Sequence, residues 1–230
     1  MGAIYLIRHG QASFGADDYD KLSTTGVEQA RVLGQSLVTR GIKPDRIICG
    51  NMLRHRETAQ AALEQLGAPA QWETEAGWNE YDHVAIIAGH TPRWRDQVAM
   101  KAELAKEPNP RRAFQGVFEE AIARWVGGQH NDDYPESWAG FCARVSGALT
   151  RLHEGLGKSQ TALVFTSGGA ISAVAQRMLQ LDDRNTFRLN WIIANAGLTK
   201  LIYSERGLYL SALNDHAHFE GANAHLISYR

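Results

Sequence analysis

The hydrophobic residues of the chain fall into short, separate runs rather than long stretches. Several runs are rich in Val, Ile or Leu, and they end in polar or small residues, as buried strands of a parallel sheet do. The predicted strands are residues 3–7, 46–50, 71–75, 161–166, 198–203 and 208–213. The last two flank Glu205-Arg206-Gly207, a sequence that predicts a hairpin.

Between these runs the apolar positions recur at helical spacing. The Ser-Thr-Thr sequence at 23–25 offers an N-cap for the first predicted helix, which Gly41 ends. Further helices are predicted over about 54–66 and 138–156, and from Ala170 onward. Strands that alternate with helices predict an α/β three-layer sandwich. We expect a mostly parallel central sheet with one antiparallel strand and helices on both faces.

The segment at about 78–140 has a different pattern. It holds four of the six tryptophans and four of the six prolines, with few β-branched runs. We interpret it as a helical insertion that forms a cap over the active site. A chain of 230 residues suits one domain, so we predict a single domain over 1–230 that includes this cap.

Composition and charge exclude several classes of protein. The formal net charge of −1 lacks the basic excess of a nucleic-acid-coating or membrane-surface protein. Two cysteines, Cys49 and Cys142, cannot form a disulfide framework and are typical of a reducing compartment. The chain shows neither a secretory signal nor an apolar stretch long enough to span a bilayer, so we expect a cytoplasmic protein.

Two predicted strands end in residues suited to an anion. Arg8-His9-Gly10 follows the first strand, and Ser167-Gly168-Gly169 follows the strand at 161–166 and opens a helix. Ligands of open α/β sheets bind beyond the carboxyl ends of the strands, and helix N-termini favour anions. A guanidinium suits bidentate phosphate binding, and an imidazole can act as a nucleophile. The pattern therefore indicates a phosphate site, although an Arg-His pair alone is also common on surfaces.

Other chemical motifs are missing from the sequence. It has no dinucleotide-binding glycine fingerprint and no phosphate-binding loop of the Walker type. Phe165 stands where a serine-hydrolase elbow needs a small residue, which argues against a nucleophilic Ser167. His216 and His218 are the only close histidine pair, and no further ligand spacing completes a zinc site.

Motifs along the chain resemble those of the histidine phosphatase superfamily, the phosphoglycerate-mutase-like group. They occur in the family's order and span nearly the whole sequence. The matching segments are Leu6–Gly10, Leu22–Ala30, Asn51–Arg54 with Glu57–Ala59, Trp78–Glu80, Tyr134–Ser137 with Arg144-Val145, Asn195–Thr199 and Asn214–His218.

The resemblance implies a role for each matching residue. His9 would attack phosphorus in line and form a phosphohistidine. Arg8 and Arg54 would hold the phosphoryl oxygens and offset the charge of the transition state. Glu80 would protonate the leaving oxygen and then help to activate water. Because the arginines supply the positive charge, neither a metal nor a cofactor is implied.

The sequence departs from the family pattern at several positions. Ser167 stands where the family usually has a second histidine before Gly168, and these two residues would bind phosphate with less positive charge. His55 stands where alanine is more usual, and Gly15 where many relatives have asparagine. Three histidines are candidates to compensate for Ser167, although a core or surface role is favoured for each: His83, His216 and His218.

The implied function is that of a metal-independent phosphomonoester phosphatase acting on a small phosphorylated metabolite, with low activity if Ser167 impairs catalysis. One alternative is a phospho-ligand-binding protein with little or no catalysis. Another is a phosphoglycerate mutase, which needs extra basic residues that Arg111 and Arg112 could supply. The implied partner is the phosphorylated substrate, with no nucleic acid and no membrane, and a homo-oligomer stays open.

The basic pairs of the insertion have no assigned role. Arg93 with Arg95, and Arg111 with Arg112, are expected on solvated faces, as most charge clusters are. The alternative is that one pair recognises the far end of an acidic substrate.

Overall fold

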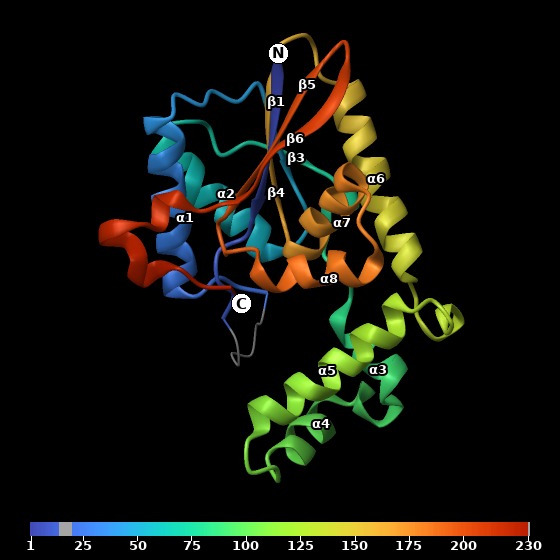
Figure 1. Ribbon diagram of the computed structural model, residues 1–230. Coiled ribbons are helices and arrows are strands. Elements are labelled where there is room, and N and C mark those ends of the chain that lie inside the picture. Colours follow the sequence, from blue (N-terminus) through green and yellow to red (C-terminus); the bar gives the residue numbers. More distant parts are fainter. Residues whose placement is uncertain (14–19, 230) are drawn as a thin grey trace. The chain divides into compact units, whose positions relative to one another are not determined.

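A computed structural model describes residues 1–13 and 20–229 of the chain (Figure 1). Within this part the strands form one six-stranded sheet in the order β3-β2-β4-β1-β5-β6. The strands are β1 (Gly2–Arg8), β2 (Arg46–Cys49), β3 (Glu73–Thr74), β4 (Thr161–Thr166), β5 (Leu198–Ser204) and β6 (Gly207–Asp215).

Strand direction follows the prediction. β2 is parallel to both β3 and β4, and β4 is parallel to β1. β5 runs antiparallel to β1 and to β6, so one strand opposes the rest. The predicted hairpin is confirmed as β5 and β6, and the pairing of Arg8 with Thr166 aligns the carboxyl ends of β1 and β4.

Helices lie on both faces of the sheet, as predicted (Figure 1). They are α1 (Thr24–Thr39), α2 (Leu53–Leu66), α6 (Trp138–Glu154), α7 (Gly168–Leu179) and α8 (Asp183–Ile192). Of the three candidate caps of α1, Ser23 is the one whose side chain accepts a hydrogen bond, from Gly26 N at 3.0 Å.

Two helices differ from the sequence prediction. α7 begins at Gly168 rather than Ala170, because both glycines after Ser167 adopt helical geometry. α8 was not predicted at all. Its buried residues are Thr186 and Phe187, so it lacks the apolar stripe that periodicity detects.

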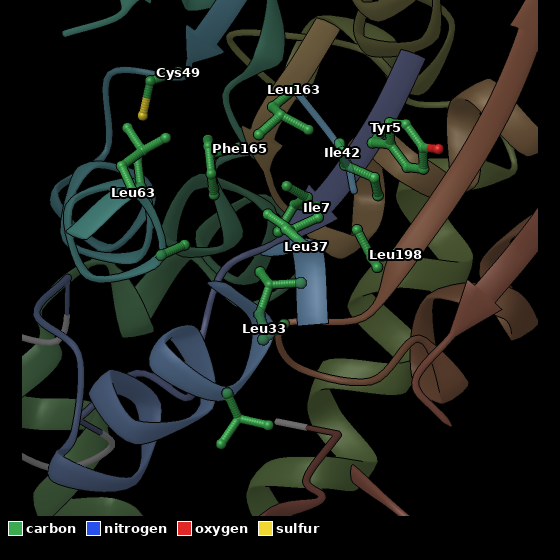
Figure 2. Packing of buried hydrophobic residues seen from close by; sticks show 14 of the residues in the cluster. Tyr5, Ile7, Leu33, Leu37, Ile42, Cys49, Leu63, Leu163, Phe165 and Leu198 are labelled. Atoms are coloured by element: carbon green, nitrogen blue, oxygen red, sulfur yellow. The ribbon is translucent and has the colours of Figure 1, made fainter. Parts of the chain in front are cut away.

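The main core shows why β1 is apolar throughout. Successive side chains of a strand point to opposite faces, so both faces of β1 need apolar residues when both are covered. Tyr5 and Ile7 pack with Leu33 and Leu37 of α1 in one buried cluster. Figure 2 shows Leu37 beside Ile7, on the side of the sheet where α1 and α2 lie. Ile4 and Leu6, which alternate with them, are fully buried as well.

The chain divides into two compact units, Met1–Glu80 with Val145–Arg230, and Tyr81–Arg144. The second contains α3 (His83–His90), α4 (Gln97–Leu104) and α5 (Pro110–Val126). Its bounds lie close to those of the insertion expected at about 78–140, and the role of this segment as a cap stays a prediction. One of its buried clusters is Ile87, Trp94 and Met100.

No helix in the described part of the chain has the length and apolarity that crossing a bilayer requires.

Candidate active site

Three adjacent parallel strands, β2, β4 and β1, end at one edge of the sheet. Backbone hydrogen bonds tie the residues that follow them together. His9 N donates to the carbonyl of Thr166 at 2.9 Å, and Gly50 N donates to that of Phe165 at 3.0 Å. The chain therefore leaves the three strands at the same level, where α/β folds bind their ligands.

His9 follows β1 and is only 6% exposed. Its Nδ1 lies 2.7 Å from the carbonyl oxygen of Gly10, which can only accept, so Nδ1 carries the proton. Burial, and then the positive charges of Arg54 and Arg8, hold the pKa of His9 well below its usual value. At neutral pH His9 is therefore uncharged, with a lone pair on Nε2.

The loop after His9 is fixed by close backbone packing. Gly10 N donates to Thr58 Oγ1 at 3.0 Å. A Cβ on Gly10 would stand 2.3 Å from the carbonyl oxygen of Gly26, so a larger residue would push the loop away from α1. The position of the His9 imidazole thus depends on Gly10, where no side chain would fit.

Arg8 and Arg54, the two predicted arginines, lie close enough to His9 for their positive charges to lower its pKa, after the larger effect of burial. Arg8 donates through Nη1 to the carbonyl oxygens of Ile193 and, at 3.0 Å, Tyr229. Arg54 is 5% exposed and donates through Nη1 to Asp20 Oδ1 at 2.7 Å.

Gly168 and Glu80 meet at the N-terminus of α7. A Cβ on Gly168 would stand 3.5 Å from Arg8 Nε and 2.5 Å from Asn190 Oδ1, so a larger residue here would have to displace the end of the Asn190 side chain. Gly169 N donates to Glu80 Oε2 at 3.2 Å, which places a carboxylate where the helix dipole is positive. Because His9 N donates to the carbonyl of Thr166, three residues before Gly169, Glu80 and His9 lie at the same end of the sheet.

Ser167 follows β4 and is fully buried. Its Oγ does not cap α7 but lies 2.6 Å from Nε2 of His55, which is also fully buried. The ring centroids of His55 and His9 are 5.8 Å apart. Burial, followed by the charge of Arg54, lowers the pKa of His55 well below its usual value.

The partner of Ser167 is thus His55 and not one of the three candidates His83, His216 and His218. His216 Nδ1 and His218 Nε2 lie 2.6 and 3.1 Å from the carbonyl oxygens of Asn214 and Ala196. His83 begins α3 in the other unit. The sequence does single out both His55 and Ser167 as departures from the family pattern. The missed signal was that the two departures occur together.

Asp20 also contacts a residue of the site, and the sequence analysis did not identify it. Its carboxylate accepts hydrogen bonds from Arg54 Nη1 and from Leu53 N, both at 2.7 Å. It therefore holds the first turn of α2 and one end of the Arg54 guanidinium. Gly15, noted above as a departure from the family, lies outside the described residues.

The basic pairs of the second unit lie on exposed positions, as expected. Arg93 forms a fork-like ion pair with Glu103, with Nη2 and Oε1 2.8 Å apart. Arg95, Arg111 and Arg112 are exposed as well. A role of these residues toward a substrate stays a prediction.

No group of three or more His, Cys, Asp or Glu side chains in residues 1–13 and 20–229 is arranged to hold a metal ion.

Comparison with known families gives one match that covers most of the chain. The family described as the histidine phosphatase superfamily, branch 1, matches residues 4–216.

Individual proteins are similar over different lengths. The mitochondrial serine/threonine-protein phosphatase Pgam5 of Drosophila virilis is 45% identical over 65 residues, which are 27% of this chain and 22% of that protein. The chain thus matches about a fifth of the length of this relative. Among solved structures, a phosphoserine phosphatase mutant from Entamoeba histolytica, in complex with phosphoserine, superposes with a TM-score of 0.66. It is 17% identical and covers 95% of this chain and 99% of its own.

A phosphoglycerate mutase from Bacillus anthracis superposes with a TM-score of 0.62 at 17% identity, over 94% of both chains. At 17% identity these two similarities establish the fold of the chain alone. One of the two proteins is a phosphatase and the other is a mutase.

Proposed function

The chain belongs to the histidine phosphatase superfamily, and from this premise we propose that it is a metal-independent phosphomonoester phosphatase with His9 as its nucleophile. Family membership confirms the prediction of a phosphatase at the level of the class of enzyme. The observation that carries the assignment of His9 is its protonation. The Nδ1 proton is held by the Gly10 carbonyl, and burial with two arginines keeps the ring neutral.

In the first step Nε2 of His9 attacks the phosphorus of the monoester in line. A P–N bond forms while the P–O bond to the leaving group breaks. Glu80, in its protonated form, gives its proton to the leaving oxygen, so that an alcohol departs. Arg8 and Arg54 bind the equatorial phosphoryl oxygens, whose charge they offset.

In the second step a water molecule attacks the phosphohistidine. Glu80, now a carboxylate, takes a proton from the water as the new P–O bond forms. The P–N bond breaks, the electron pair returns to Nε2 and inorganic phosphate leaves. The two steps restore the starting proton count of both side chains.

The surroundings of Arg54 support its role. Its Nε is buried and has no hydrogen-bond partner in the part of the chain that the structure describes. A buried donor without an acceptor is costly, and a phosphoryl oxygen would satisfy it. Gly168, at the helix N-terminus beside Arg8, adds a backbone environment that favours an anion.

The proposed substrate is a small phosphorylated metabolite. One structural neighbour was solved in complex with phosphoserine, and one relative is a serine/threonine-protein phosphatase. Phosphoserine and phosphopeptides therefore belong in a panel of test substrates.

We propose a cytoplasmic location, since Cys49 and Cys142 are both thiols in the described part of the chain. The near-neutral charge gives no reason to expect a nucleic acid or a membrane as partner.

The test is hydrolysis of an aryl phosphate by the wild type and by His9→Ala, each with and without a chelator. We expect the wild type to turn over equally in both conditions and His9→Ala to lose at least about 10³-fold in kcat. His225→Ala, which removes an exposed histidine, is the matched control and should match the wild type. Equal rates for wild type and His9→Ala would refute the proposal.

A second assay separates the alternatives. Conversion of 3- to 2-phosphoglycerate at a rate above hydrolysis would indicate a mutase instead. Binding of inorganic phosphate without turnover of any substrate in the panel would indicate a binding protein.

A further inference from the structure

The two departures from the family pattern, at positions 55 and 167, form one contact in space. They lie 112 residues apart in sequence, yet His55 Nε2 and Ser167 Oγ are 2.6 Å apart. His55 comes from the first turn of α2 and Ser167 directly follows β4, so the contact joins the helix after β2 to the end of β4. The fold therefore places a histidine in contact with the position where the family pattern has one.

The position of the proton on His55 follows from its neighbours. Nδ1 is buried and has no hydrogen-bond partner among the described residues, so a proton there would have no acceptor. A proton on Nε2 has Ser167 Oγ as its acceptor. The neutral ring that its lowered pKa indicates therefore donates from Nε2 to Ser167.

This donation determines what the serine can do. The Ser167 oxygen accepts from His55, and its own hydroxyl proton is left for another acceptor. A hydroxyl that already accepts a hydrogen bond becomes a stronger donor, and the effect is larger in a buried, low-dielectric site. Ser167 directly precedes Gly168 and lies at the strand end beside His9, where the phosphoryl group would bind.

We propose that His55 is a positioning residue that acts through Ser167, so that the pair donates one directed hydrogen bond to the transferring phosphoryl group in place of a second histidine. The inference rests on the proposed function. Ser167 is the residue that touches the phosphoryl oxygen, and His55 orients and polarises its hydroxyl. No additional reactant is needed, because no covalent bond forms at either residue.

The residues packed around His55 hold its imidazole in a fixed position. A Cβ on Gly50 would stand 2.3 Å from His55 Nδ1 and 2.9 Å from its Cε1, so the ring needs the glycine at the end of β2. Asn79 Oδ1 accepts from Asn51 N at 2.6 Å and closes the same corner. A buried nitrogen without a partner lowers stability, which is typical of residues retained for a functional reason.

The first experiment compares two variants of similar size at position 55. Gln can donate an N–H from its end to Ser167, whereas Leu cannot. We expect His55→Gln to keep kcat within about fivefold and His55→Leu to lose about 10²–10³-fold, the scale of one lost donor to a developing oxyanion. Equal losses in both variants, or no loss in His55→Leu, would overturn the proposal.

The second experiment moves the histidine back. Ser167→Ala should lose as much kcat as His55→Leu, and the two changes combined should lose no more than either alone, because they remove one donor. His55→Ala with Ser167→His, which restores the usual family pattern, should recover turnover. Additive losses from His55→Leu and Ser167→Ala would contradict a shared role. A protein with His55→Ala and Ser167→His that folds but stays as slow as Ser167→Ala would contradict it as well.

Controls separate this inference from the proposed function. Ser172→Ala removes a buried hydroxyl of α7 that has no partner among the described residues, and it should leave kcat unchanged. If His9→Ala is inactive while His55→Leu matches the wild type, the phosphatase stands and the role of His55 fails. If His9→Ala matches the wild type, the proposed function itself fails.

Discussion

Two buried imidazoles characterise the site at the scale of single residues. His9 and His55 are held neutral mainly by burial, with nearby arginine charge as the next cause, so both have a lowered pKa in the folded protein. A neutral His9 is the form that can attack phosphorus, and a neutral His55 keeps one proton for Ser167. The same burial that prepares the chemistry ties the stability of the fold to pH.

We predict that the free energy of unfolding falls as the pH drops below about 6.5. The unfolded chain then protonates these histidines while the folded chain does not, so acid favours unfolding. Each histidine adds a limiting slope of about 1.4 kcal/mol per pH unit. His218, whose pKa is lowered to about 4 by burial, adds in the same direction.

Urea unfolding at pH 7 and at pH 5 measures the effect. The loss of stability between the two should be smaller in His55→Ala than in the wild type, because one such group is gone. His225→Ala, at an exposed position, should follow the wild type. Equal pH dependence in wild type and His55→Ala would show that His55 is not held neutral.

At the scale of elements, α2 begins without a cap of its own. Met52 at its N-cap makes no side-chain hydrogen bond to the helix. The carboxylate of Asp20 accepts from Leu53 N instead, so a residue from a distant loop does what an N-cap side chain usually does. Because α2 carries both Arg54 and His55, this contact also holds two residues of the site.

We predict that Asp20→Ala destabilises the protein by about 1 kcal/mol, the usual effect of losing a helix cap. Asp20→Asn keeps an oxygen acceptor and should lose less than half as much. Thermal or urea unfolding of the three proteins measures this difference. An Asn variant as unstable as the Ala variant would mean that the charge pair with Arg54, rather than the cap, carries the effect.

The elements that the sequence predicted well are those with a strong local signal. β4 has the predicted bounds because the apolar run Ala162–Phe165 is flanked by two β-branched threonines. Ser23 caps α1, as a serine before a helix often does. α8 was missed because few of its residues are buried. Local pattern cannot report a helix that presents no apolar stripe.

At the scale of the whole molecule, a net charge near zero conceals a cationic site. Arg8 ends β1 and Arg54 lies in the first turn of α2, and the sheet order β2-β4-β1 brings both to the same histidine. Both arginines could be predicted from the sequence because their motifs resemble those of a known family. It could not pair His55 with Ser167, because a contact across 112 residues depends on strand order rather than on any local pattern.

The most direct test of the account is to trap the phosphorylated enzyme during turnover. The wild type is mixed with excess aryl phosphate and quenched within milliseconds, one half in alkali and the other half in acid. Both halves are analysed by intact mass and peptide mapping. We predict one added phosphoryl group on His9, stable in alkali and lost in acid, as a P–N bond is. A phosphoryl group on Ser167 that survives acid, or steady turnover with no phosphorylated enzyme and full activity of His9→Ala, would contradict it.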